Sequence, residues 1–143
     1  MGAVGLTDLA FPVLCLSHDT SIVVARDADE LGQCNALAFW GNHYFRDLRV
    51  IDSSGITYTV IDAEPETAYS RVAQLFARLT NRTLRVRLRL RADGPASLVI
   101  AKRLASEWLD RAPEFWESSA ELGEWKARVM ACNSVGELIK VFE

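Results

Sequence analysis

Residues 82–91 read Arg-Thr-Leu-Arg-Val-Arg-Leu-Arg-Leu-Arg, so arginine and aliphatic residues alternate there with a period of two. Only an extended strand separates two such sets, because successive side chains of a strand point to opposite faces of a sheet. One face of the predicted strand consists of Leu84, Val86, Leu88 and Leu90, and the other of Arg85, Arg87, Arg89 and Arg91. We expect the aliphatic face to be buried and the arginine face to be at least partly exposed.

Other short apolar runs predict the rest of a sheet. Residues 48–51 and 56–61 are rich in β-branched side chains, and the Asp-Ser-Ser-Gly sequence at 52–55 joins them. This pattern is typical of a β-hairpin, with an aspartate that forms the turn and a glycine able to take a positive φ. Residues 12–16 and 21–25 are consistent with two strands, or with one strand and an irregular entry.

Helical spacing of apolar residues predicts two helices before the arginine strand. Asp27 followed by Glu30 is a capping signal, and it predicts a helix over 28–40 that stops at Gly41. Pro65 suits the first turn of a second helix. The apolar stripe of that helix consists of Tyr69, Val72, Phe76 and Leu79.

Three further helices are predicted after the arginine strand. A turn at 93–95 leads into a helix that ends before Pro113. Its inward face consists of Leu98, Ala101, Leu104, Ala105, Trp108 and Leu109. Ser118 with Glu121, and Ser134 with Glu137, are Ser-x-x-Glu capping boxes that predict two short helices in the C-terminal segment.

The order of these elements predicts an α+β domain over residues 1–143. No repeat, low-complexity tract or long linker offers a domain boundary. We expect a mostly antiparallel sheet of three or more strands, with helices packed on one face and a helical C-terminal segment.

Composition narrows the class of protein. No apolar run approaches the roughly 20 residues that a membrane-spanning helix needs, so no membrane partner is expected. The three cysteines at 15, 34 and 132 are odd in number and far apart, unlike a secreted disulfide framework. We therefore expect buried free thiols and a cytoplasmic protein.

Charge is unevenly distributed along the chain. Residues 1–70 carry three basic and ten acidic side chains, residues 71–103 carry nine and one, and residues 104–143 carry four and eight. The three blocks have net charges of −7, +8 and −4, within a total of −3. Such blocks either neutralise one another within the fold or form separate binding surfaces.

The search for catalytic and cofactor motifs gives no match. The sequence lacks the glycine-rich nucleotide signatures, Gly-x-Ser-x-Gly and His-Glu-x-x-His, so neither a catalytic residue nor a cofactor is predicted. Cys15, His18, Cys34 and His43 match no standard zinc spacing, and no metal site is predicted. A triad of Ser17, His18 and Asp19 is rejected, because neighbouring residues of a strand point to opposite faces.

An acidic and aromatic cluster is the first candidate binding surface. Phe115 and Trp116 follow Pro113 in a connection, and both cannot easily face the same interior. One exposed aromatic surrounded by carboxylates is typical of a surface that binds a basic protein. The candidate residues are Glu114, Phe115, Trp116, Glu117 and Glu121, with two core aromatics at the end of a helical layer as the alternative interpretation.

The arginine row is the second candidate surface, represented by Arg85, Arg87 and Arg89. Like charges along one sheet face repel, so counter-charges are expected nearby. Asp52, Asp62 or Glu64 are the internal candidates, and an acidic protein partner is the external one. Nucleic acid is disfavoured, because the whole chain is acidic and no aromatics alternate with the arginines.

The segment from Leu48 to Val60 resembles one found in small bacterial α+β proteins of the toxin-immunity type. The resemblance implies a binding protein encoded beside its partner. The leading hypothesis is a non-enzymatic protein-binding module, an immunity or antitoxin-like inhibitor that occludes a partner such as a toxin by charge complementarity. The alternatives are a small-ligand-binding protein or enzyme with a cleft lined by His43, Tyr44 and Asp52, and a homo-oligomer pairing an acidic helical face with the arginine strand.

Overall fold

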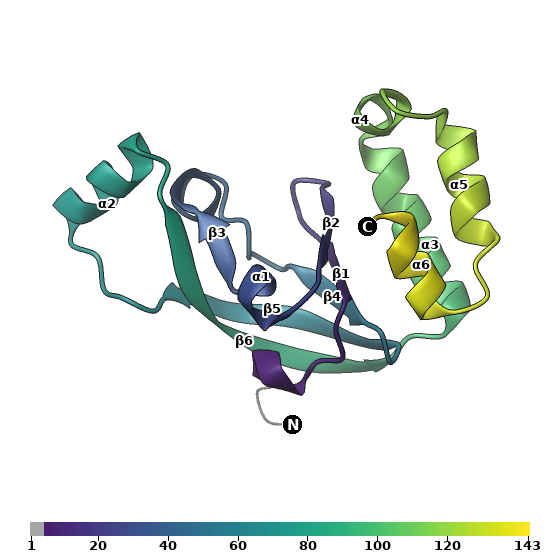
Figure 1. Cartoon of the computed structure of the whole chain (residues 1–143), viewed down its shortest axis with the longest axis horizontal. Helices are drawn as coiled ribbons and strands as arrows, with labels where there is room; N and C mark the ends of the chain where they lie inside the picture. Colours follow the sequence, from purple (N-terminus) through teal and green to yellow (C-terminus); the bar gives the residue numbers. More distant parts are fainter. Residues whose placement is uncertain (1–4) are drawn as a thin grey trace.

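A six-stranded antiparallel sheet forms the centre of the computed structural model, which describes residues 5–143 (Figure 1). The strand order is β2-β1-β4-β5-β6-β3, and every pair of neighbouring strands is antiparallel. The strands are β1 Val13–Leu16, β2 Ile22–Ala25, β3 Gln33–Asn35, β4 Arg49–Asp52, β5 Ile56–Pro65 and β6 Thr83–Pro95. The expected α+β class with a mostly antiparallel sheet is confirmed.

Helices lie at both ends of this sheet and beside its middle. The short ones near the N-terminus are η1 Leu6–Asp8, α1 Ala28–Leu31 and η2 Leu37–Gly41, and the others are α2 Arg71–Leu79, α3 Leu98–Arg111, α4 Pro113–Glu117, α5 Leu122–Met130 and α6 Val135–Val141. Helices α3 to α6 gather at one end of the molecule, whereas α2 projects from the other (Figure 1). The expected helical C-terminal segment is therefore present.

Strand β6 has the predicted two faces. Leu84, Val86, Leu88 and Leu90 are buried, and Arg85, Arg87, Arg89 and Arg91 are exposed. The β4–β5 hairpin is also confirmed. Its Gly55 has a φ of 87°, and the buried Asp52 accepts hydrogen bonds from the main-chain N–H groups of Ser54 and Ile56, as expected of a turn-forming aspartate.

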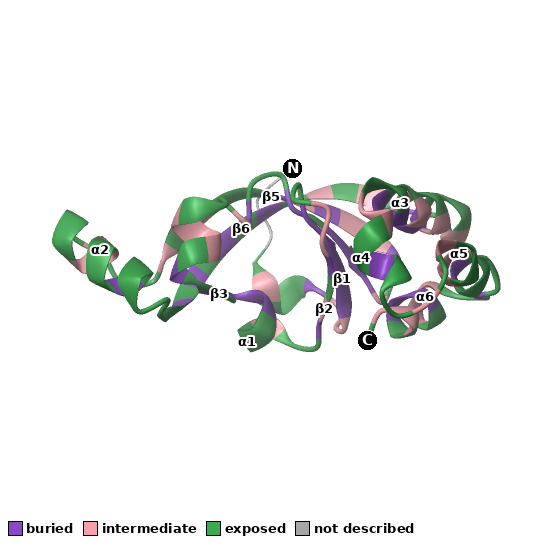
Figure 2. Cartoon of the chain, turned by 90° about the horizontal axis from the view of Figure 1, so that it is seen from above, coloured by how far each residue is buried: buried purple, intermediate pink, exposed green. Residues whose placement is uncertain are grey.

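Two hydrophobic cores lie against the sheet, and β1 contributes to both. Val13 and Cys15 belong to the sheet core, which also contains the four aliphatic residues of β6. Leu14 and Leu16 belong to the helical core. The helical core also contains Ile22, Ile51, Ala101, Ala105, Trp108, Leu109, Trp116, Val129, Cys132, Leu138 and Ile139. Buried residues accordingly follow the strands and the inner sides of the C-terminal helices (Figure 2).

The caps of the C-terminal helices explain where these helices begin. Ser97 accepts a hydrogen bond from the N–H of Ile100 at the start of α3, and Ser134 accepts one from Glu137 at the start of α6. The capping box predicted at Ser118 and Glu121 is wrong. Pro113 starts the short helix α4 instead, so Ser118 lies at its C-terminal end and donates to the Phe115 carbonyl oxygen at 2.7 Å.

The predicted helix over 28–40 is also wrong. Helix α1 ends at Leu31, and residues 33–35 form strand β3, in which Cys34 pairs with Leu84. Strand β5 occupies one edge of β6, and at residues 83–86 the opposite edge has main-chain groups that need partners. Segment 33–35 supplies those partners, and this pairing outweighs the helical periodicity of the sequence.

The second predicted helix starts later than expected. Pro65 is the last residue of β5, and α2 begins at Arg71 after its N-cap Ser70. A strand end tolerates proline because a main-chain donor is dispensable there. The apolar stripe expected on this helix exists, but it faces solvent.

Candidate partner-binding surfaces

The arginine row on β6 is only partly neutralised by the fold. Arg85 lies 3.6 Å from Asp29, measured from Nη1 to Oδ1, and both side chains are exposed. Arg87 and Arg89 lie opposite Glu64 and Asp62 in the β5–β6 register. Within residues 5–143, however, the structure contains no ion pair to Arg87 or Arg89. These two guanidinium groups are therefore available to a partner.

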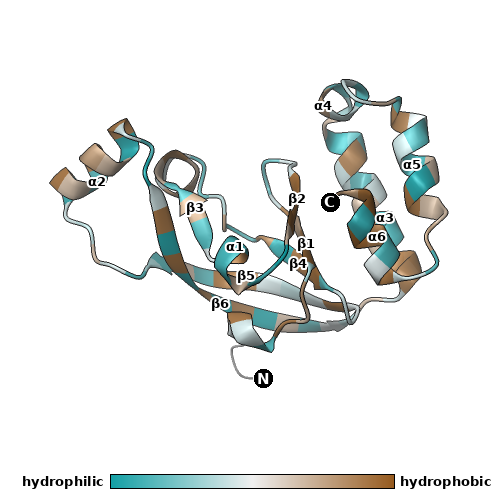
Figure 3. Ribbon diagram, viewed as in Figure 1, coloured by the Kyte–Doolittle hydropathy of each residue, from teal (hydrophilic) through white to brown (hydrophobic). Residues whose placement is uncertain are grey.

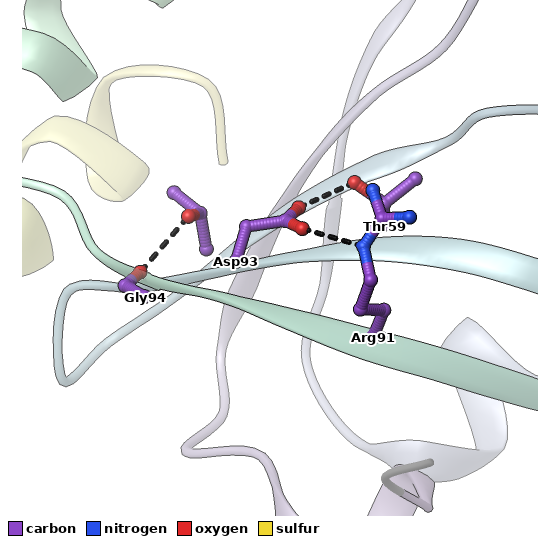
Figure 4. A network of polar contacts seen from close by, with 5 residues as sticks. Thr59, Arg91, Asp93 and Gly94 are labelled. Carbon is purple, nitrogen blue, oxygen red and sulfur yellow. Dashed lines mark hydrogen bonds and ion pairs between the residues drawn. The ribbon is translucent and has the colours of Figure 1, made fainter. Parts of the chain in front are cut away.

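Arg91, at the end of the row, has an internal partner in Asp93 (Figure 4). Arg91 Nε donates to Asp93 Oδ1 at 2.9 Å, and the Thr59 hydroxyl donates to Oδ2. A register shift near Thr57 leaves Asp93 without a ladder partner. Partial burial alone would raise the pKa of Asp93, but these hydrogen bonds and the charges of Arg91 and Arg49 hold it below its usual value.

Asp52 does not serve as a counter-charge for the row. Its carboxylate is buried in the β4–β5 turn, where it also accepts hydrogen bonds from the Ala10 N–H and the Tyr58 hydroxyl. Of the three carboxylates proposed to neutralise the arginines, only Asp62 and Glu64 lie opposite them in the sheet, and neither forms an ion pair with any residue that the structure describes.

The arginine face of the sheet continues into the face that the C-terminal helices cover. Leu16, Arg49, Thr59 and Arg91 form one cross-strand row in the register of β1, β4, β5 and β6. Leu16 packs in the helical core, whereas Arg91 is exposed. Side chains directly opposite one another share a face, so the helices cover the apolar part of this face and leave the arginine part open.

The acidic and aromatic cluster keeps one exposed aromatic. Phe115 is 68% exposed, whereas Trp116 is buried against Trp125 and Phe142, with ring centroids 5.1 Å and 5.7 Å away. The expectation that Phe115 and Trp116 face different environments is confirmed. Glu114, Glu117 and Glu121 are all exposed in or beside α4. This surface therefore combines three carboxylates with Phe115, and Trp116 supports it from the core.

Helix α2 presents a third surface, which sequence reasoning missed. Its large apolar side chains are between 56% and 73% exposed. These residues are Val72, Leu75, Phe76 and Leu79. The small residues Ala73 and Ala77 are the less exposed apolar ones, and Ala77 is the buried residue of the helix. Brown residues are accordingly prominent on the projecting α2 (Figure 3). The periodicity of the sequence revealed an apolar face and a second face on this helix, but it did not show which of the two packs against the rest of the protein.

Two neighbouring grooves lie on either side of Trp40, one between β5 and the segment 39–47 and the other among the end of β5, residues 67–74 and β6. The larger, of about 520 Å³, is lined by residues that include Trp40, His43, Arg46, Asp62 and Arg91. The smaller, of about 250 Å³, shares Trp40 and reaches Arg87. Aromatic side chains thus lie near two arginines of the row, although they come from another segment of the chain.

The three residues proposed to line the cleft of a small-ligand-binding protein or enzyme do not lie together. His43 lines the larger groove, Tyr44 lines a separate pocket beside Cys15 and Cys34, and Asp52 is buried in the hairpin turn. That part of the ligand-binding alternative is therefore wrong. The Ser17, His18 and Asp19 side chains form no triad either, since Asp19 accepts from Ser17 whereas His18 Nε2 contacts the Asn42 carbonyl oxygen at 2.8 Å.

The cysteines are buried thiols, as expected. Burial raises the pKa of Cys15 to about 12 and that of Cys34 to about 11, so both are protonated at neutral pH. Among the described residues, no three His, Cys, Asp or Glu side chains gather closely enough to hold a metal ion.

Comparisons with known proteins gave no relatives. No family model matches the chain, and neither a curated protein nor a solved structure resembles it significantly. Within the described part of the chain, no helix has the length and apolar character required to cross a membrane.

Proposed function

We propose that this chain is a protein-binding module that occludes an oppositely charged partner. The observation that carries the proposal is the exposed pair Arg87 and Arg89, which has no ion pair within the described structure. Residues 67–92 contain seven arginines and no lysine, aspartate or glutamate. Such a surface attracts an acidic partner, speeds its association and rejects basic proteins.

The basic surface is favoured over the acidic one as the binding site. Burial of Trp116 leaves the acidic surface with Phe115 as its exposed aromatic, whereas the basic end also carries the apolar face of α2. Binding energy is concentrated in desolvated apolar and arginine anchors rather than in rim charges.

An inhibitor of the toxin-immunity type is the specific form that we propose. Occlusion needs only a rigid complementary surface, which agrees with a chain in which no catalytic motif is found. We also propose a cytoplasmic location, since three buried thiols without a disulfide suit a reducing compartment.

Charge reversal tests this proposal. The partner is isolated from the native host with the whole chain as bait, and its affinity is measured at low and high salt. Arg87→Glu with Arg89→Glu should weaken binding by at least about tenfold at low salt, because the pair faces an acidic surface. Arg103→Glu with Lys140→Glu is the matched control, since both residues are exposed and the charge changes equally.

The contrary result is equally clear. Affinity that is insensitive to salt and unchanged in the Arg87 and Arg89 variant would reject electrostatic docking. Loss of binding only in a Glu114→Lys, Glu117→Lys, Glu121→Lys variant would transfer the site to the acidic surface.

Small-ligand binding is the second candidate, and the groove of about 520 Å³ favours it. Arg46 and His43 contribute polar groups to a partly aromatic lining, as is typical of ligand pockets. A thermal-shift screen of small metabolites on wild type and on Arg46→Ala tests it. A compound that stabilises only the wild type supports this function, and no stabilisation by any compound argues against it.

A further inference from the structure

Helix α2 is oriented against the usual preference of a surface helix. An amphipathic helix normally turns its large apolar side chains inward. In α2 the residue that packs against the body is Ala77, whereas Val72, Leu75, Phe76 and Leu79 face solvent. A contiguous exposed apolar face on a projecting helix is typical of a protein interaction site.

Charged residues border only one side of this apolar face. At 100° per residue, Arg71 and Arg78 fall on the same flank of the stripe, and Ala73 and Ala77 fall on the opposite flank, toward the body. Both arginines are exposed, and α2 contains no carboxylate. The helix therefore offers an apolar ridge with a basic border along one edge.

We infer that α2 is the anchor of the complex, inserted as a helix into an apolar groove of a protein partner whose facing wall carries carboxylates. This inference rests on the proposed function and names the element that makes the contact. Helix-in-groove recognition uses anchors at i, i+3, i+4 and i+7, and Val72, Leu75, Phe76 and Leu79 have this spacing. Arg71 and Arg78 then pair with the carboxylates of that wall.

A second copy of the chain is a poorer occupant. A two-fold dimer brings the same surface of both copies together, so two carboxylate-free, arginine-rich ends would meet. The nine residues of α2 are also few beside the 20–30 residues per partner of a standard interface. An acidic groove avoids the repulsion and extends contact to the neighbouring arginines.

A lipid surface also fits the chemistry of α2 less well than a groove does. A bilayer presents the same headgroups on both sides of an embedded helix, and such helices carry basic residues along the polar face as a whole. In α2 the flank opposite the arginines consists of alanines that turn toward the body. One basic border suits a groove with one acidic wall.

Site-specific photocrosslinking in the native host tests the inference. Benzoylphenylalanine replaces Phe76 in one full-length variant and Phe115 in a second, because both phenylalanines are similarly exposed. The Phe76 variant should crosslink to a protein. The partner identified by this crosslink, purified on its own, should bind the unmodified chain. Leu75→Ala with Phe76→Ala should weaken that binding by at least about tenfold, as expected for anchor residues.

Two matched variants complete the design. Val99→Ala with Met130→Ala removes apolar side chains of similar exposure elsewhere and should leave affinity within about twofold. Arg71→Glu with Arg78→Glu should weaken binding at low salt more than at high salt. Circular dichroism on each variant checks that α2 and the sheet are intact.

Each remaining outcome overturns the inference. Crosslinking of Phe76 to another copy, a concentration-dependent dimer in sedimentation, or Phe76-dependent binding to vesicles containing about 30% anionic lipid identifies another occupant. A crosslink from Phe115 alone rejects α2 but keeps the protein-binding function. No crosslink at either position rejects both.

Discussion

The indole Nε1 of Trp108 donates a hydrogen bond of 2.8 Å to the main-chain oxygen of Ser17. This contact joins the last turn of α3 to the residue that follows β1, and both residues are buried. Arg111 lies over the same indole at 4.0 Å from the ring centroid. Trp108 therefore positions the helical segment on the sheet as well as filling its core.

Trp108→Phe should destabilise the chain by about 1–3 kcal/mol, because it leaves the buried Ser17 carbonyl without this donor and removes apolar volume. Urea unfolding followed by circular dichroism measures the change. Trp125→Phe is the comparison, since its Nε1 donates to the Trp116 carbonyl oxygen at a partly buried position. Equal losses in the two variants would contradict the role assigned to Trp108.

Leu90→Ala should cost about 2–5 kcal/mol, because the side chain is fully buried in the sheet core and its removal leaves a cavity. Arg89→Ala next to it should change stability by under about 0.5 kcal/mol, since that side chain is exposed and unpaired in the described structure. Chemical denaturation of both variants provides the measurement. Similar costs at the two positions would reject the alternation of faces along β6.

Asp52→Asn should lower the pKa of Tyr58. Burial raises that pKa, and the charge and hydrogen bond of Asp52 raise it further. Absorbance titration of the phenolate near 295 nm, with Tyr58→Phe to assign the group, measures the change. An unaltered titration would show that the two side chains are uncoupled in solution.

The thiols should react slowly in the native state, because burial raises the pKa values of all three cysteines. Titration with a chromogenic disulfide at pH 8 should consume three equivalents only after unfolding. Rapid reaction before unfolding would place at least one thiol at the surface.

Asp93 should contribute to stability at neutral pH and lose that contribution in acid. Its folded pKa is lowered, so the contribution is present above the unfolded value of about 3.9 and disappears as the pH falls through the folded value. Because the site is partly exposed, the effect should stay under about 1 kcal/mol. Asp93→Asn and wild type should therefore converge in stability near pH 2, and a constant difference across this range would contradict the linkage. Glu107→Gln is the exposed control.

The elements predicted correctly from the sequence are those that a local pattern specifies. The alternation of arginine and aliphatic residues in β6 is compatible only with an extended strand. The turn sequence at 52–55 determines a hairpin whichever strands flank it. The helix predicted over 28–40 failed because its competitor, the open edge of β6, lies about 50 residues away along the chain. Local periodicity carries no information about such a distant partner.

The candidate surfaces were predictable only in part. Composition located the arginine row and the acidic cluster, since charges can be counted without a fold. It did not predict that Trp116 would turn inward or that α2 would turn its alanines to the body, because both depend on which neighbour offers a complementary surface. The same limit applies to the grooves, which bring Trp40 near Arg87 and Arg91 from different segments.

Strand β1 contributes alternate side chains to the two cores: Val13 and Cys15 to one, Leu14 and Leu16 to the other. Loosening this strand removes packing from both sides of the sheet simultaneously. We therefore expect the C-terminal helices and the sheet to unfold as one cooperative unit, without a stable intermediate in which only the helices have come away. A partner that immobilised the far end of β6 would then also slow hydrogen exchange in α3 and α6, although it touched neither helix.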